Sequence, residues 1–381
     1  MNFRNLNKYF LNSWNLNSIM MKKREFIKTL ALSSAGLSLL SSLAGCSLVS
    51  AGGKMSSDWV WMNAGNLNSG EWREVFSHLK KAGIGGILLR GSTDDYKRIV
   101  PLAAKHRIDI HAWIITLNRA WDEEAKRHPE WFTVSRKGDS CYDVHPYVDY
   151  YQWVCPSRED VYQHVEKEVM SLLKIQGLKG VHLDYIRYSD VILPVGLWKK
   201  YNLVQDKEYP EFDFCYCDTC REKFITESGI DIRELADPTA SAEWREYRWN
   251  SVTHFVNRLA EKVHNDSPDK RLTAAVFPYP EIARAICRQD WAKWNLDGFF
   301  PMIYHSFYNE DINWIGSSVA KGVADLNGKA PLFAGLFIPA LSPETIGEAV
   351  DISLKNGAEG ICYFDYGSLS EEHWSALAAR K

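Results

Sequence analysis

The sequence lacks a strong net charge, a long apolar run and a glycine-rich nucleotide-binding motif. Its 381 residues carry a formal net charge of −3, so there is no electrostatic basis for binding nucleic acid. The apolar stretch at residues 30–40 is too short and too rich in serine to span a bilayer. No G-x-G-x-x-G or P-loop motif follows the first predicted strand at 59–64, which counts against a nucleotide-binding protein.

The N-terminal segment has the pattern of a bacterial export signal. From Met21 it reads MKKREFIKTLALSSAGLSLLSSLAGC, with a basic start, an apolar middle and small residues at its end. Residues 43–46 resemble a lipobox, in which Cys46 becomes the lipidated first residue of the mature chain. We therefore expect residues 1–57 to form an N-terminal extension, lipoprotein signal and linker. Residues 58–381 are then one domain, anchored in the bacterial envelope at the outer membrane or its periplasmic face.

Short apolar runs alternate with longer segments of helical period over the rest of the chain, as in repeated βα units. The predicted strands are residues 59–64, 85–91, 109–117, 180–186, 272–278, 298–305, 332–339 and 360–367. Eight parallel strands with intervening helices indicate an α/β fold, a (β/α)8 TIM-like barrel, with a doubly wound sheet as the alternative. In such barrels the functional groups follow the carboxyl ends of the strands. The connections after strands three and four, 118–157 and 187–240, are long enough to build a substrate groove.

The fourth predicted strand becomes polar at its end, in the sequence GVHLDYIRY at 180–188. Strand alternation directs His182 and Asp184 into the barrel lumen, with Asp184 at the catalytic rim. Arg187 and Tyr188 follow within reach, and we expect them to hold the carboxylate ionised and oriented, as a nucleophile or general base requires. The alternative is a structural aspartate that ties a barrel loop to an arginine.

Cleavage of a glycosidic bond requires a second carboxyl group that donates a proton. Three candidates follow other predicted strands: Glu281, Asp290 and Asp365. Asp365 shares the inward parity of Asp184, whereas Glu281 also suits the first turn of a helix. The residue pattern alone does not choose among them.

Histidines and aromatic residues indicate how a substrate could be held. His182 and His305 are candidates to contact sugar hydroxyls or to be buried structural groups. His111 is predicted to be a core histidine, because no metal-binding H-x-H or carboxylate set accompanies it. The chain has 15 Trp, 18 Tyr and 16 Phe, more than a core of this size usually needs. We expect some of these rings to line a groove and stack on sugars.

Eight cysteines include Cys46 and leave an odd number, which does not make a complete disulfide framework. Cys215, Cys217 and Cys220 in the sequence CYCDTC are too close for mutual disulfides and suit a tetrahedral metal. Cys141 or Cys155 could supply the fourth ligand and join the two long connections. We expect a structural zinc and no cofactor for catalysis, with disulfides or free thiols as the alternative.

Several of these segments, in the same order, resemble glycosyl-hydrolase-like family ten. The matching segments are HPEWFTVSRKGDS, VCPSREDV, GVHLDYIRYSD, FDFCYCDTCREKF, QDWAKWNLDGFFPMIYH and GICYFDYG, over roughly residues 58–370. The resemblance implies a TIM-barrel glycosidase of the bacterial envelope; some such lipoproteins act on peptidoglycan strands stripped of peptides. It puts Asp184 at the family's acidic strand-four position and Tyr304 in its strand-six block. Tyr185 stands where related sequences often carry a second acid, and CYCDTC also resembles the zinc-binding cysteines of some barrel galactosidases.

The sequence thus predicts an envelope-anchored glycoside hydrolase that cleaves a polysaccharide or a peptidoglycan glycan strand. Asp184 is the essential carboxylate in this hypothesis, and Arg187, Tyr188 and Tyr304 orient it or the sugar. The alternative is a barrel lipoprotein that binds glycan without cutting it, because the residue pattern does not identify the acid. A second carboxyl group across a groove from Asp184 distinguishes the two.

Overall fold

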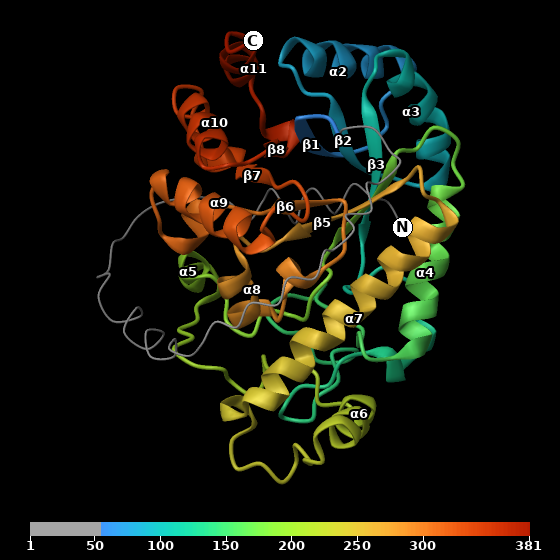
Figure 1. Ribbon diagram of the computed structural model, residues 1–381, viewed down its shortest axis with the longest axis vertical. Helices are drawn as coiled ribbons and strands as arrows, with labels where there is room; N and C mark the ends of the chain where they lie inside the picture. The colour runs from blue at the N-terminus through green and yellow to red at the C-terminus, as the bar shows by residue number, and fades with distance from the viewer. Residues whose placement is uncertain (1–54) are drawn as a thin grey trace, which may run out of the picture. The chain divides into compact units, whose positions relative to one another are not determined.

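The computed structural model describes residues 55–381, which contain an eight-stranded parallel barrel (Figure 1). The strands are β1 (Asp58–Asn63), β2 (Gly86–Arg90), β3 (Asp109–Ile115), β4 (Gly180–Asp184), β5 (Arg271–Val276), β6 (Gly298–Pro301), β7 (Phe333–Phe337) and β8 (Gly360–Phe364). They pair in the order β6-β5-β4-β3-β2-β1-β8-β7. Two parallel bridges, Phe299 to Leu332 and Met302 to Gly335, connect β6 with β7 and nearly close the barrel. The predicted (β/α)8 fold is confirmed. The predicted signal and Cys46 lie outside the described residues.

Helices connect the strands and surround them (Figure 1). They are α2 (Ser69–Lys81), α3 (Thr93–Lys105), α4 (Glu159–Leu173), α5 (Trp198–Tyr201), α6 (Asp218–Ser228), α7 (Ala242–Asp266), α8 (Pro280–Cys287), α9 (Asn313–Leu326), α10 (Ile346–Lys355) and α11 (Glu371–Ala378). Capping boxes at Asn68 and Ser92 start α2 and α3, since each side chain accepts a backbone N–H of the first turn. No helix within residues 55–381 combines the length and apolar character needed to cross a membrane.

The strands bury both faces, and alternate residues face the helices or the lumen. The lumen is packed by Trp59, Trp61, Leu88, Trp113, Ala275, Phe300, Phe333 and Cys362. Glycine makes room for these large rings: a Cβ at Gly86 would lie 2.3 Å from the ring of Trp59. The lower lumen is therefore filled, and ligand access is restricted to the rim at the carboxyl ends of the strands.

The two long connections predicted after β3 and β4 are present and touch each other. The first runs from β3 to α4, and the second carries α5 and α6 before α7 begins. Ser135 of the first forms an antiparallel bridge with Phe214 of the second. Helices α4 and α7, which follow the two connections, lie side by side (Figure 1). These connections form a joint layer beyond the barrel strands.

Candidate active site and cysteine cluster

Asp184 lies at the carboxyl end of β4 with its side chain at the top of the lumen, as predicted from strand parity. Trp113 of β3 donates its indole N–H to Asp184 Oδ2 at 2.9 Å, and the Tyr185 amide donates to Oδ1 at 2.7 Å. Tyr185 has a left-handed φ of 53°, so the chain turns sharply directly after the carboxylate. Asp184 itself is only 7% exposed. Both oxygens are therefore held in place, one by an indole of the neighbouring strand β3 and one by the amide of the next residue.

Burial raises the pKa of Asp184 above its usual range. Four neighbouring groups lower this pKa, but together they do so less than burial raises it. They are the Tyr185 amide, the Trp113 indole and the charges of Arg187 and Arg90. The charge of Arg187 favours the ionised form, in the predicted direction, but burial has the larger effect on this pKa. A carboxyl group with a raised pKa is better suited to donate a proton than to remain a permanent anion.

Arg187 points to a different aspartate. Its Nη1 lies 3.1 Å from Asp190 Oδ2 and donates to the Tyr188 carbonyl at 2.9 Å. The guanidinium lies 4.7 Å from the ring centre of Trp153 and 4.9 Å from that of Phe277. Arg187 thus stabilises the loop after β4 through these contacts. It affects Asp184 only through its charge.

Tyr188 is buried on the side of the cysteine cluster. Burial raises the pKa of its hydroxyl, and the largest charge effects come from Cys220 and Cys155. Its oxygen has no hydrogen-bond partner within residues 55–381. Tyr188 thus lies near the cysteines Cys155, Cys215 and Cys220.

Tyr304 connects Asp184 with a second carboxylate. Its buried hydroxyl has no hydrogen-bond partner in the described part of the chain. Burial raises the pKa of this hydroxyl most. The charge of Asp184 raises it further, and the charge of Asp365 adds a smaller increase. The Tyr304 ring lies 5.6 Å from the ring of Phe364, the last residue of β8 and the neighbour of Asp365. Tyr304 is therefore within electrostatic range of both carboxylates at one rim.

Asp365 is more open than Asp184. It follows β8 directly, is half-buried, and accepts a hydrogen bond from Ser368 Oγ at 2.7 Å. One rim thus carries a deeply buried carboxyl group and a partly solvated one.

The other two acid candidates have partners outside this group. Glu281 lies in the first turn of α8 with 56% of its side chain exposed, 3.9 Å from Lys321 of α9. Asp290 is buried between Arg284 at 2.8 Å and Lys293 at 2.9 Å. Both arrangements are typical of structural ion pairs.

Two of the three histidines named from the sequence are packing groups in the lumen. His182 is fully buried; its Nε2 accepts from the Trp61 indole at 3.3 Å, and its Nδ1 lies 3.0 Å from Thr273 Oγ1. Burial lowers its pKa, so the ring is neutral. His111 also contacts Thr273 Oγ1, at 3.2 Å, and burial lowers its pKa to about 3, which confirms a core histidine.

His305 differs, because it follows Tyr304 at the rim. It is half-buried and its Nδ1 has no partner within the described residues. Burial lowers its pKa, so the ring is neutral near pH 7 and can donate or accept. This nitrogen and the Tyr304 hydroxyl are two polar groups of the rim that have no hydrogen-bond partner among the described residues.

Three rim residues were not identified from the sequence: Arg90, Trp113 and Trp121. Arg90 ends β2 and interacts electrostatically with Asp184 and Tyr185. The sequence did contain a sign of Arg90, because the apolar run of the β2 segment GGILLRG ends at this charged residue. Trp113 is one of many aromatic residues in strands, so nothing in the sequence marked it as the donor to Asp184.

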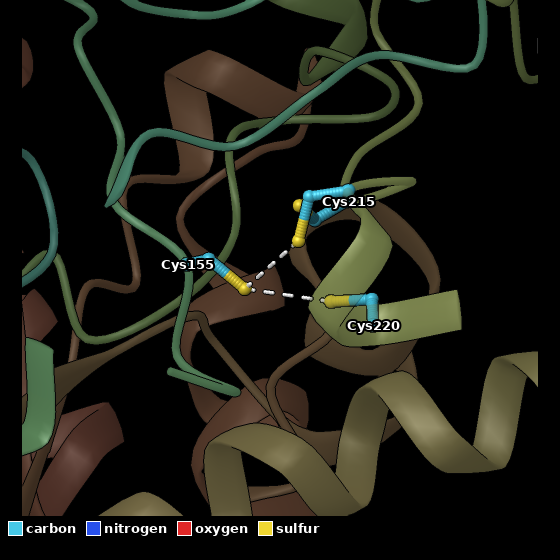
Figure 2. Close-up of side chains that lie close together, drawn as sticks. Cys155, Cys215 and Cys220 are labelled. Atoms are coloured by element: carbon cyan, nitrogen blue, oxygen red, sulfur yellow. Dashed lines mark hydrogen bonds between the residues drawn. The ribbon is translucent and has the colours of Figure 1, made fainter. Parts of the chain in front are cut away.

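A second constellation joins the two long connections. The thiols of Cys155, Cys215, Cys217 and Cys220 all lie within 4.8 Å of one another and are buried. Cys155 Sγ is 3.4 Å from Cys220 Sγ and 3.8 Å from Cys217 Sγ. Figure 2 shows Cys155 facing Cys215 and Cys220 across the gap between the connections. Four thiols in this arrangement could hold a structural metal such as zinc.

Cys155, rather than Cys141, completes the cluster. Cys141 donates to the Tyr151 carbonyl at 3.1 Å and accepts from the Trp153 amide, away from the four thiols. Burial raises the pKa of Cys155 and Cys215, whereas hydrogen bonds from its three neighbours lower that of Cys217. Several thiolates in such a site need a cation to be stable together.

No family model matches the chain, and no curated protein matches it either. Solved structures do resemble it. The β-galactosidase of the psychrophilic Marinomonas ef1 has a TM-score of 0.63 at 10% identity and covers 85% of this chain. That of Bacillus circulans sp. alkalophilus has a TM-score of 0.60 at 12% identity, also over 85%. This chain covers 58% and 55% of those two proteins, respectively.

The catalytic domain of a β-amylase from Paenibacillus polymyxa is also similar, with a TM-score of 0.56 and 11% identity. The likeness covers 85% of this chain and 97% of that domain. At such identities the likeness shows the fold, which is that of glycoside hydrolase TIM-barrel domains. The function of the chain therefore has to be inferred from the side chains at the carboxyl ends of its own strands.

Proposed function

We propose that this chain is a glycoside hydrolase of the bacterial envelope, related to glycosyl-hydrolase-like family ten, that cleaves a polysaccharide or a peptidoglycan glycan strand. The observation that carries the proposal is the pair of unlike carboxyl groups, Asp184 and Asp365, in range of one buried hydroxyl at the barrel rim. Glycosidases use such a pair. The second carboxylate also favours hydrolysis over binding without cleavage.

In the proposed mechanism Asp184 is the general acid. Burial raises its pKa and so favours the protonated form, and the donors Trp113 and Tyr185 hold the carboxyl group in place. It donates this proton to the glycosidic oxygen as the bond to the anomeric carbon breaks. Asp365 supplies the second carboxylate, as a nucleophile at the anomeric carbon or as a base for the attacking water. Glu281 stays outside this pair, and Glu281→Gln is expected to lower turnover far less than Asp365→Asn in a reducing-end assay.

Tyr304→Phe is expected to lower kcat by about 10- to 100-fold while leaving thermal stability unchanged or slightly higher. The hydroxyl is buried without a partner in the described chain, so its removal breaks no internal hydrogen bond. In the proposed mechanism this hydroxyl forms a hydrogen bond to the sugar or to the charge that develops beside Asp184. Steady-state kinetics and a melting curve on the same preparation check both parts. Loss of stability with full kcat would give the hydroxyl a structural role instead.

We further propose that Cys155, Cys215, Cys217 and Cys220 hold one zinc ion, which fastens the two long connections over the barrel rim. Four thiolates fill a tetrahedral zinc and leave no position for water, so the site is structural. The residues that act on the glycan are those of the rim.

The proposed anchor is a lipid on Cys46, outside the described residues. Cys46→Ser is expected to abolish incorporation of labelled fatty acid and to move the protein from the membrane fraction to the soluble periplasmic fraction. Exchange of the neighbouring Ser47 for alanine is the matched control and keeps the label. Unchanged labelling of the Cys46 variant would contradict the lipoprotein assignment.

A further inference from the structure

Arg90 is a cation at the rim, and no carboxylate of residues 55–381 forms an ion pair with it. It is the last residue of β2 and is half-buried. Its guanidinium forms neither an ion pair nor a hydrogen bond with the part of the chain that the structure describes. The guanidinium lies over the ring of Trp121, with 5.7 Å between its central carbon and the ring centre. A guanidinium presents five N–H donors in a planar fork that matches a carboxylate.

The surroundings of Arg90 leave its charge incompletely compensated. Burial lowers the pKa of Arg90, and the nearby Tyr185 and Asp184 offset this only in part. Asp184 already accepts hydrogen bonds on both oxygens, from Trp113 and Tyr185. Removing a cation from water without a partner costs free energy, so an incoming anion gains more here than at the open surface.

Trp121 supplies a flat apolar surface directly beside this cation. It is 46% exposed, an unusual degree for a tryptophan in this chain. One of its faces is supported by Tyr150, since the two ring centres are 5.8 Å apart and the planes are inclined by 20°. Aromatic faces of this kind pack on the apolar faces of sugar rings. The charged fork and the flat ring are thus presented together at the strand ends.

We propose that Arg90 and Trp121 form a subsite for a sugar unit that carries a carboxylate. Trp121 stacks on the ring of this unit, and Arg90 pairs with its carboxylate. The inference rests on the proposed glycan-binding rim and specifies its substrate class as acidic glycans. Peptide-stripped peptidoglycan strands, whose lactyl carboxylates are free, are a suitable probe of this chemistry.

The first test measures binding without cleavage. The Asp184→Asn chain is titrated with peptide-stripped strands and with the same strands after their carboxylates have been converted to amides. We expect the acidic strands to bind about 10- to 100-fold more tightly, as for one charge-assisted contact. Arg90→Gln in this background should remove that preference, whereas the matched exchange at Arg127, an exposed arginine paired with Glu124, should keep it. Equal affinity for the two strands before Arg90 is changed would overturn the subsite, even if the Arg90 variant failed to fold.

The second test separates this inference from the proposed reaction. Hydrolysis of both strands is measured for the wild type and Arg90→Gln. A selective loss on the acidic strands supports the subsite. An equal loss on both strands, with a shifted pH profile, would mean that Arg90 acts through Asp184, and the subsite is rejected. Charge-dependent binding without any hydrolysis would reject the proposed reaction and leave the subsite standing.

Discussion

Cys155→Ser is expected to release the bound metal and to lower the unfolding temperature by about 3–6 °C. Cys155 comes from the connection after β3, and its three partners come from the connection after β4. Losing this ligand leaves buried thiols that must become neutral and frees two long segments from each other. A loss of about 3 kcal/mol, at about 1–2 °C per kcal/mol for a domain of more than 300 residues, gives the expected shift.

Cys141→Ser is the matched control, because Cys141 is equally buried and lies on the same connection but outside the cluster. Elemental analysis should find one zinc per chain in the wild type and in the Cys141 variant, and little in the Cys155 variant. A metal-free wild-type chain with disulfides among the four cysteines would contradict the zinc assignment.

Asp184→Asn is expected to lower kcat/KM by about 10²- to 10⁴-fold, the range for loss of a general acid. The amide has nearly the same shape and still accepts one hydrogen bond, from Trp113 or from the Tyr185 amide. Losing the other costs about 1 kcal/mol. The melting temperature should therefore change little, and kinetics with a melting curve separate chemistry from folding.

The pH dependence gives a second signature of Asp184. Because its pKa is raised in the folded state, the folded chain holds this proton more tightly than the unfolded chain, where the pKa is about 3.9. Wild-type stability from this group is therefore present at low pH and is lost as pH rises through the folded pKa. Activity should fall on the alkaline side of the same pKa, since the acid must be protonated. Relative to the wild type, Asp184→Asn should gain stability as pH increases over this window.

The barrel could be predicted from the sequence because each strand has both faces buried. All eight observed strands lie within two residues of a predicted start, and β4 has the predicted parity, with Asp184 at its inward-facing end. The cysteine cluster was predictable up to its fourth ligand. Cys141 and Cys155 lie on the same connection, and only the pairing of Thr133 with Trp153 and Cys141 decides which thiol reaches the other three.

The electrostatics of the rim could not be predicted in the same way. Asp184 and Asp190 are both three residues from Arg187, so spacing does not select the partner. The structure selects Asp190 because Asp184 ends a strand facing the lumen, whereas Arg187 lies in the loop beyond it. The raised pKa of Asp184 depends on burial by residues of other strands. Tyr304 likewise comes within electrostatic range of Asp184 and Asp365 only when the barrel closes.

Reducing-end release from a panel of envelope and plant glycans tests the central claim most directly. The panel includes peptide-stripped peptidoglycan, and the wild type and Asp184→Asn are compared side by side, with Asp351→Asn as an exposed-aspartate control. The account predicts release by the wild type and the control, and none above background by Asp184→Asn. Equal release by Asp184→Asn, or binding of a glycan by the wild type with no release from any member of the panel, would contradict it.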